Sequence, residues 1–201
     1  MALQLQKVSA GERINLSKDH SELKKIKIGL SWDVKEGVTA DLDASLVVLG
    51  ENEKMLAEDS ILFYNSPKNP QGKPVLYNGA LEHSGDEKTG AADGDDETIT
   101  IDLTKIPADV KIMLAAITIY GVGQSSPVTF GRVKNAMVKL YNAETNEALY
   151  QFDLTEDASR GTSVEMARIY LKDGQWRFTA LGDILGTAPN GLEDIVNKYK
   201  K

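Results

Sequence analysis

The chain has 201 residues, with 30 acidic side chains against 23 basic ones, and it contains no cysteine. A chain of this length buries roughly 70% of the surface that its unfolded form exposes, so we expect a single domain over residues 1–201. The lack of cysteine excludes disulfide scaffolds, thiol nucleophiles and cysteine-ligated zinc. The net charge of −7 argues against a nucleic-acid partner, because that affinity comes mostly from lysine and arginine neutralising phosphates.

Targeting signals are not evident. Residues 1–16 alternate apolar and polar side chains and lack the basic start and apolar block of a signal peptide. The longest nearly apolar stretch, residues 112–122, is too short to cross a bilayer, which takes about 20 residues. These features predict a cytoplasmic protein without direct membrane insertion.

Strand patterns dominate the first two thirds of the chain. Apolar and polar side chains alternate over residues 25–32 and again over 98–103, which predicts two strands with one buried face each. Residues 110–120 form a more continuous apolar run. Its isoleucine and threonine residues favour a strand buried on both faces over a core helix.

Two hairpins and one helix are expected after that run. The first hairpin joins residues 137–141 to 148–152, and the second joins residues 164–171 to 175–180. Asp173 and Gly174 lie in the second turn, and Asp-Gly between alternating runs favours a type I′ turn. Near the C-terminus, Asn190 and Glu193 resemble a capping box, and an apolar stripe follows at helical spacing: Leu192, Ile195, Val196 and Tyr199.

The strand count sets the fold class. About eight strands separated by turns favour a mainly β protein, an antiparallel two-sheet β-sandwich with a few short helices, including the C-terminal one. A wound α/β sheet would need a helix between successive strands. We expect Trp32 and Trp176 to fill the core, and His83 to be a surface imidazole.

The negative charge is concentrated in the middle of the chain. Residues 41–97 hold thirteen carboxylates and four lysines, a net charge of −9, and residues 85–97 alone hold six carboxylates. Two carboxylates about 5 Å apart repel each other by about 3 kcal/mol at an effective dielectric constant near 20. A folded loop must therefore separate them, protonate them or bind a cation; a solvated acidic loop is the alternative.

Calcium is the cation that suits this segment best. It accepts six to eight oxygen ligands in irregular geometry, whereas magnesium demands a stricter octahedron. Residues 85–97 contain neither cysteine nor histidine, which disfavours zinc and copper. Asp41 and Asp43 offer a second half-site, because in an extended segment they point to the same side, about 6–7 Å apart. The spacing of glycine and glutamate around both segments does not match an EF-hand.

Five motifs occur in order along the chain. They are Gly29-Leu30-Ser31-Trp32-Asp33, Asp41-Leu42-Asp43-Ala44-Ser45, Phe63-Tyr64-Asn65, the acidic loop of residues 85–97 and residues 152–159, with Gly174, Trp176 and Phe178 near the end. In these motifs the sequence resembles the TerD family of tellurium-resistance and general stress proteins. The resemblance implies a bacterial cytoplasmic β-sandwich that binds calcium and an integral-membrane partner of the TerC type.

The same resemblance implies a set of calcium ligands. It comprises seven carboxylates and one amide oxygen: Asp41, Asp43, Asp86, Asp93, Asp95, Asp96, Glu97 and Asn65. Seven carboxylates exceed what one calcium ion needs, so one or two ions are expected. Four loop residues depart from the family pattern, which favours one full site: Glu87, Lys88, Ala91 and Ala92.

The favoured function is that of a non-catalytic calcium-binding stress protein. The alternative is a magnesium-dependent phosphoryl- or glycosyl-transferring enzyme that uses Asp41 as nucleophile and Asp43 as general acid. That chemistry would place the Asp-x-Asp motif at the end of an apolar parallel strand. A third hypothesis is a scaffold in a membrane-associated complex, in which calcium is purely structural.

Overall fold

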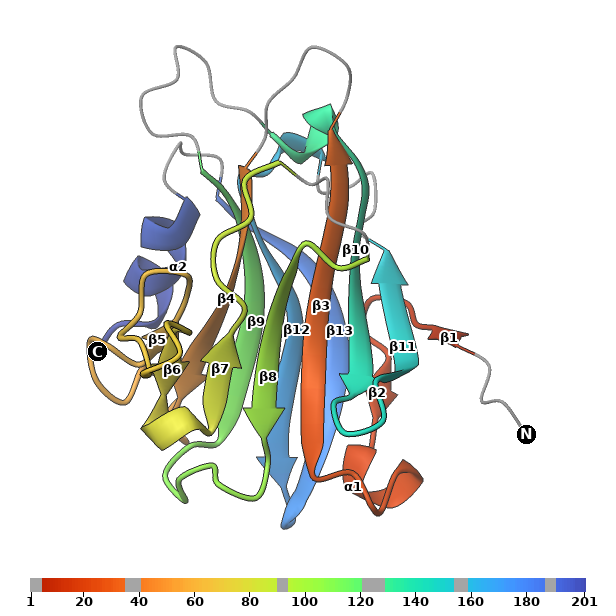
Figure 1. Ribbon diagram of the computed structural model, residues 1–201, viewed down its shortest axis with the longest axis vertical. Helices are drawn as coiled ribbons and strands as arrows, with labels where there is room; N and C mark the ends of the chain where they lie inside the picture. Colours follow the sequence, from red (N-terminus) through yellow and green to blue (C-terminus); the bar gives the residue numbers. More distant parts are fainter. Residues whose placement is uncertain (1–4, 35–40, 90–93, 121–128, 154–158, 187–190) are drawn as a thin grey trace.

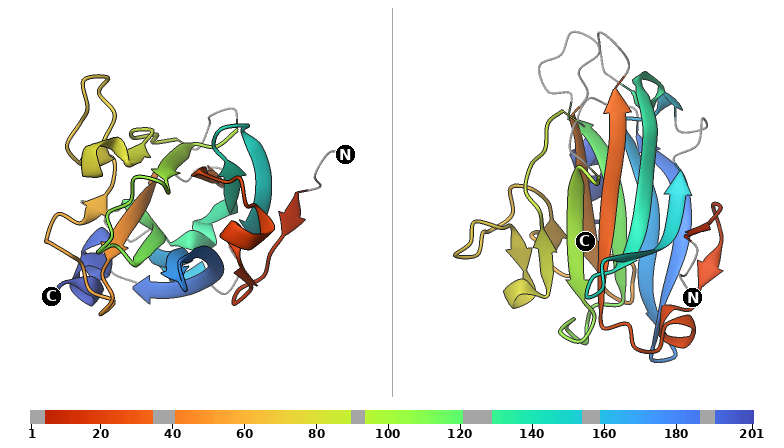
Figure 2. Two further views of the ribbon diagram at one scale, coloured as in Figure 1. Left: turned by 90° about the horizontal axis from the view of Figure 1, so that it is seen from below. Right: turned by 45° about the vertical axis from the view of Figure 1, so that its right-hand side comes forward.

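The computed structural model describes residues 5–34, 41–89, 94–120, 129–153, 159–186 and 191–201. Two β-sheets lie face to face, as the predicted sandwich requires (Figures 1 and 2). The first sheet has the strand order β1 (Gln6–Lys7), β11 (Glu147–Asp153), β10 (Val133–Asn142), β3 (Lys25–Val34), β8 (Glu97–Asp102), β7 (Leu81–His83) and β6 (Val75–Leu76). The second has the order β2 (Arg13–Ile14), β13 (Gln175–Gly186), β12 (Ser163–Lys172), β9 (Ile112–Tyr120), β4 (Asp41–Leu49) and β5 (Ile61–Leu62).

Helical segments are short and few in the described ranges. They are α1 (Leu16–Asp19), α2 (Gly191–Tyr199) and two 3₁₀ turns at Tyr77–Gly79 and Phe130–Arg132. Within those ranges no helix has the length and hydropathy needed to span a membrane. Among the described residues the paired strands are antiparallel except for one pair, in which β1 runs parallel to β11.

The core lies between the two sheets. On β3 the predicted alternation is confirmed, since Ile26, Ile28, Leu30 and Trp32 are all buried there. Trp176 packs partly buried against the same core. The tight hairpin between β12 and β13 has positive φ at Asp173 (54°) and Gly174 (71°), as a type I′ turn needs.

The second sheet is covered on its outer face as well. Leu114 and Ala116 of β9 pack with Ile195 and Tyr199 of α2 in a separate apolar cluster, while alternate β9 residues face the main core. This explains the continuous apolar run of β9, because both of its faces are buried. The prediction of a C-terminal helix packed on a sheet is confirmed; its proposed cap, Asn190, lies outside the described residues.

Candidate metal centre

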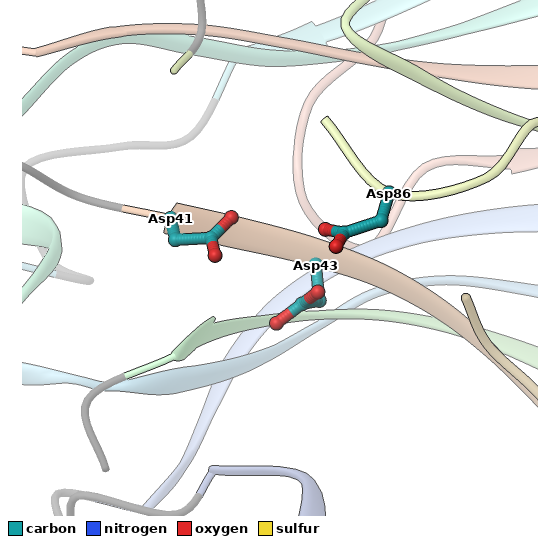
Figure 3. A group of neighbouring side chains, drawn as sticks. All are labelled: Asp41, Asp43 and Asp86. Atoms are coloured by element: carbon teal, nitrogen blue, oxygen red, sulfur yellow. The ribbon is translucent and has the colours of Figure 1, made fainter. Parts of the chain in front are cut away.

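Three carboxylates from two segments meet where β4 begins (Figure 3). Asp41 and Asp43 alternate along β4 with Leu42 and Ala44, which belong to the main core, so both aspartates point to the other side of the strand. Asp86 comes from the loop that follows β7. One oxygen atom of each aspartate lies within 4.8 Å of the other two. We call Asp41, Asp43 and Asp86 the aspartate triad.

The surroundings of Asp41 and Asp43 disfavour the ionised forms of these two carboxyl groups. Burial, followed by the charges of Asp41 and Asp86, raises the pKa of Asp43 to about 7. Burial and Asp86 also raise the pKa of Asp41. Lys88 offsets part of this repulsion, because its Nζ lies 3.3 Å from Asp86 Oδ2. A divalent cation between the three oxygens would remove the remainder and would displace the proton that Asp43 holds.

The donor atoms of the triad fit a hard cation such as calcium. Asp41 Oδ1 is buried and accepts no hydrogen bond from the part of the chain that the structure describes. Calcium–oxygen distances of about 2.3–2.6 Å allow two ligands on opposite sides of an ion to be about 4.6–5.2 Å apart. The oxygens of the triad, all within 4.8 Å of one another, meet that limit.

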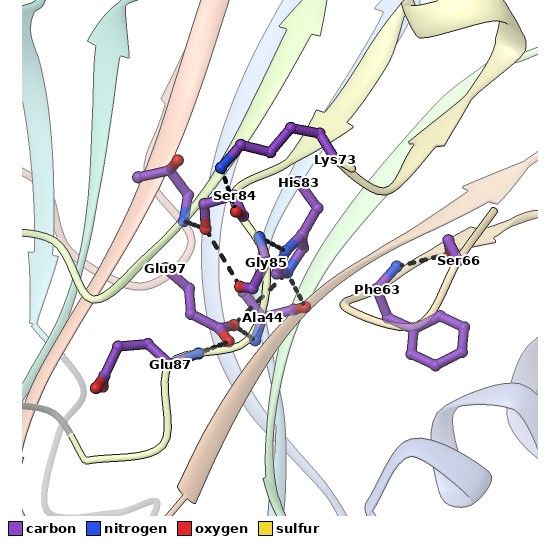
Figure 4. A network of polar contacts seen from close by, with 10 residues as sticks. Ala44, Phe63, Ser66, Lys73, His83, Ser84, Gly85, Glu87 and Glu97 are labelled. Atoms are coloured by element: carbon purple, nitrogen blue, oxygen red, sulfur yellow. Dashed lines mark hydrogen bonds and ion pairs between the residues drawn. The ribbon is translucent and has the colours of Figure 1, made fainter. Parts of the chain in front are cut away.

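A buried glutamate accepts hydrogen bonds from both segments that carry the triad (Figure 4). Glu97 of β8 is fully buried. Its Oε2 accepts the backbone N–H of Ala44 at 2.7 Å, and its Oε1 accepts the N–H of Glu87 at 3.2 Å. Ala44 follows Asp43 in the chain, and Glu87 follows Asp86. One carboxylate thus fixes the spacing between both halves of the triad.

His83 of β7 acts on the same two segments. Its Nδ1 accepts the N–H of Gly85 at 3.0 Å, so the proton lies on Nε2, which donates to the carbonyl oxygen of Ala44 at 3.0 Å. Burial lowers the pKa of His83 and raises that of Glu97 to about 8, although hydrogen bonds from Ala44 and Glu87 offset part of the latter. We call Glu97 and His83 the inter-sheet latch.

The prediction that His83 is a surface imidazole is wrong, because its side chain is completely buried. It lies two residues after Leu81, another fully buried side chain, and therefore on the same face of β7. That period-2 relation to Leu81 was the available sequence signal. The single apolar residue and the short strand made it weak.

The TerD domain matches residues 1–199 of the chain. The chain belongs to the TerD family. It is 35% identical over 194 residues to the tellurium resistance protein TerD of an Alcaligenes species, covering 96% of this chain and 95% of that protein. It is 36% identical over 195 residues to general stress protein 16U of Bacillus subtilis, with the same coverage of 96% and 95%.

A solved structure shares the TerD fold. The homologue of telluride resistance protein TerD from Streptomyces coelicolor superposes with a TM-score of 0.65 and 18% identity. The match covers 83% of this chain and 93% of that one. It supports the sandwich architecture and the mainly β class.

Two carboxylates near the end of the TerD acidic loop, those of Asp95 and Asp96, bind partners other than the triad. Asp95 Oδ1 accepts hydrogen bonds from Ser31 Oγ at 3.1 Å and Tyr141 Oη at 3.0 Å. Lys139 Nζ lies 3.7 Å from the same oxygen. An added Cβ at Gly29 would come within 2.2 Å of Asp95 Oδ2, so this motif glycine makes room for the carboxylate.

Of the remaining predicted ligands, Asp96 has another partner, Asn65 lies in a turn beside the triad, and Asp93 is outside the described ranges. Asp96 Oδ2 accepts the backbone N–H of Trp32 at 2.9 Å, which anchors the loop end to β3. Asn65 is exposed in the turn after β5. Its neighbour Tyr64 has a pKa raised by burial and then by Asp43 and Asp86, so that turn borders the triad. Asp93 lies outside the described residues.

The strand context of the Asp-x-Asp motif does not match the enzymatic alternative. Asp41 is the first residue of β4, and β4 pairs antiparallel with both β5 and β9. A nucleophile of the expected type would follow a parallel strand. The TerD relatives carry names that describe resistance and stress response.

Proposed function

We propose that the protein is a non-catalytic, calcium-binding stress-response protein in which calcium orders the acidic loops at one end of the sandwich. The observation that carries the proposal is the aspartate triad, in which the buried Asp41 Oδ1 accepts no hydrogen bond from any described residue. The names of the relatives support the link to tellurium and general chemical stress.

One calcium ion at the triad accounts for the geometry of the described residues. Asp41, Asp43 and Asp86 would supply three of the six to eight oxygens that calcium takes. Water, backbone carbonyls and the turn of Asn65 would supply others. A second ion would draw on loop carboxylates such as Asp93.

Calcium would then act as a folding ligand for the acidic end. A ligand that binds only the native state stabilises it by RT ln(1 + [L]/Kd), about 2.7 kcal/mol at a hundredfold excess over Kd. The inter-sheet latch holds the N–H groups of Ala44 and Glu87, so calcium would order the parts of the acidic loop that the latch does not hold. The ordered loops would present a calcium-dependent surface to a partner.

The cellular setting is part of the proposal. We place the protein in the cytoplasm, in contact with a membrane-associated stress complex that contains an integral-membrane partner of the TerC type. Family resemblance supports this setting. Capture of the partner from detergent-solubilised membranes, with calcium and with a chelator, separates a calcium-gated contact from a constitutive one.

Isothermal titration calorimetry of metal-depleted protein tests the ion site. We expect saturable calcium binding, weaker magnesium binding, and at least a tenfold loss of calcium affinity in Asp41→Asn. Asp33→Asn is a matched control, because Asp33 is an exposed aspartate that accepts a hydrogen bond from Asn135 in the first sheet. Absence of calcium heat, or equal losses in both variants, would overturn the proposal.

A further inference from the structure

The outer face of the second sheet carries a groove of about 450 Å³ beside α2. It is lined mainly by β2, β12 and β13, with Glu53 and Ile112 at one side. On that sheet Arg168 pairs with Leu114, and Leu114 pairs with Val47 of β4. Val47 is six residues from Asp41 along β4, or about 20 Å at 3.3 Å per residue, so the groove is separate from the triad.

Three arginines from three adjacent strands meet in this groove. Arg13 of β2 pairs with Thr179 of β13, and Thr179 pairs with Arg168 of β12. Arg177 lies two residues before Thr179 and therefore on the same face of β13. The intervening Phe178 belongs to the main core, so this face points outward. We call the feature the arginine groove.

The lining of the groove is net positive in a chain whose net charge is −7, although Arg177 Nη2 also lies 3.3 Å from Asp173 Oδ2 at its edge. Its lining contains four basic side chains, namely Arg13, Arg168, Lys172 and Arg177, against the two acidic ones of Glu53 and Asp183. Arg168 is held in place, because its Nη1 lies 3.2 Å from Glu53 Oε2 and its Nη2 donates to Tyr199 Oη at 3.2 Å.

Two guanidinium donors in the groove have no acceptor among the described residues. The Nε atoms of Arg168 and Arg177 are both buried and make no hydrogen bond within the described part of the chain. A buried N–H without an acceptor costs free energy, which an anionic oxygen would recover. Guanidinium groups bind phosphate and carboxylate oxygens through two parallel N–H donors.

We infer that the arginine groove binds a small organic polyanion whose phosphate or carboxylate oxygens accept hydrogen bonds from Arg13, Arg168 and Arg177. The volume is far larger than a single small oxyanion requires. Tyr170 and Leu181 supply apolar surface next to the arginines for the carbon part of the ligand. This site is independent of the proposed calcium centre and shares no residue with it.

Calorimetric titration of metal-depleted protein with pyrophosphate and with citrate tests the inference. We expect at least one probe to bind saturably, with affinity that falls as salt increases. Pyrophosphate binding alone indicates a phosphorylated ligand, and citrate binding alone indicates a polycarboxylate. The Arg13→Gln/Arg177→Gln double variant should lose at least tenfold in affinity and Arg13→Gln alone severalfold. Arg132→Gln, an exposed arginine outside the groove, should stay within twofold.

Three results would overturn the inference. The first is no saturable binding of either probe to the wild type. The second is an equal loss of affinity in Arg132→Gln and the double variant, which would indicate a nonspecific charge effect. The third is binding that survives in the double variant but disappears in Asp43→Asn, which would assign the heat to residual metal at the triad. An unchanged Tm of Arg13→Gln would show that the loss of affinity in this variant is not due to misfolding.

Discussion

Replacing Asp43 by asparagine is expected to stabilise the metal-depleted protein at pH 8 and to weaken calcium binding. The pKa of Asp43 is raised from 3.8 to about 7, by burial and then by Asp41 and Asp86. A carboxyl group with a higher pKa in the folded state holds its proton there after the unfolded chain has lost it. Folding stability therefore falls as the pH rises from about 4 to about 7.

The size of the effect follows from that difference. Each pKa unit corresponds to 1.36 kcal/mol, so ionised Asp43 costs the fold about 4 kcal/mol at pH 8. Asparagine has the same shape without the charge and removes this cost. Its buried amide donors cost about 1–3 kcal/mol if they find no acceptor. The net gain is about 1–3 kcal/mol, which raises Tm by about 2–4 °C per kcal/mol for a chain of this size.

Thermal melts of metal-depleted protein at pH 8 and at pH 4 measure the change in stability. A further melt at pH 8 with excess calcium measures the response to calcium. Asp43→Asn should melt higher than the wild type at pH 8, lose that advantage at pH 4, and respond less to calcium. Asp102→Asn is the opposite control. Burial of Asp102 would raise its pKa, but hydrogen bonds from Thr104 and Lys105 lower it. Removing this carboxylate should therefore destabilise the protein and leave the calcium response unchanged. A lower Tm of Asp43→Asn at pH 8 with an intact calcium response would refute the reasoning.

Three other outcomes are expected. Glu97→Gln replaces one of the two oxygens that accept the N–H groups of Ala44 and Glu87 by a donor, and should cost about 1–3 kcal/mol in urea unfolding at pH 4, where the raised pKa of Glu97 adds no ionisation cost; an unchanged midpoint at that pH would contradict the latch. Gly29→Ala places a Cβ 2.2 Å from Asp95 Oδ2 and should lower the free energy of unfolding by about 1–3 kcal/mol. Adding Asp95→Ala should restore part of this loss, and equal losses in the single and double variants would contradict the steric explanation. The metal-depleted wild type should lose stability between about pH 4 and pH 8, because Asp43 and Glu97, with pKa values of about 7 and about 8, hold protons that the unfolded chain has already lost; calcium should flatten this loss, and stability that rises over this range in urea titrations would show the wrong sign.

Local patterns were sufficient for most of the fold. Alternation predicted β3, the continuous apolar run predicted β9, and Asp173-Gly174 predicted the last hairpin, because each depends on neighbours within a few residues. The parallel pairing of β1 with β11 had no such signal. Two residues at the chain start pair with a strand more than 140 positions away, and no short-range pattern encodes that contact.

The sequence predicted which segments form the candidate site, but not which of their residues meet in the triad. Charge density and the Asp-x-Asp spacing indicated residues 85–97 and Asp41 with Asp43, and the structure brings Asp86 to that pair. Composition could not separate Asp86 from Asp95, Asp96 and Glu97. The side chains of Asp95, Asp96 and Glu97 point in different directions where β8 begins. Asp95 contacts β10, Asp96 accepts the backbone N–H of Trp32, and Glu97 enters the space between the sheets.

The arginine groove could not be predicted from the sequence for a related reason. Arg13 and Arg177 are separated by more than 160 positions and meet only because β2 pairs with β13. The sheet order, rather than any motif, creates the cluster. The same holds for the latch, in which β7 and β8 of one sheet contact β4 of the other.

A titration of metal-depleted protein with calcium, followed by amide chemical shifts, tests the central claim most directly, because it reports ion number and ligand loops together. The account predicts saturable shifts concentrated at Asp41, Asp43, Asp86 and their neighbours Ala44 and Glu87, reversed by a chelator, with little change in the arginine groove. Shifts that do not saturate, or that leave the aspartate triad unmoved, would contradict it.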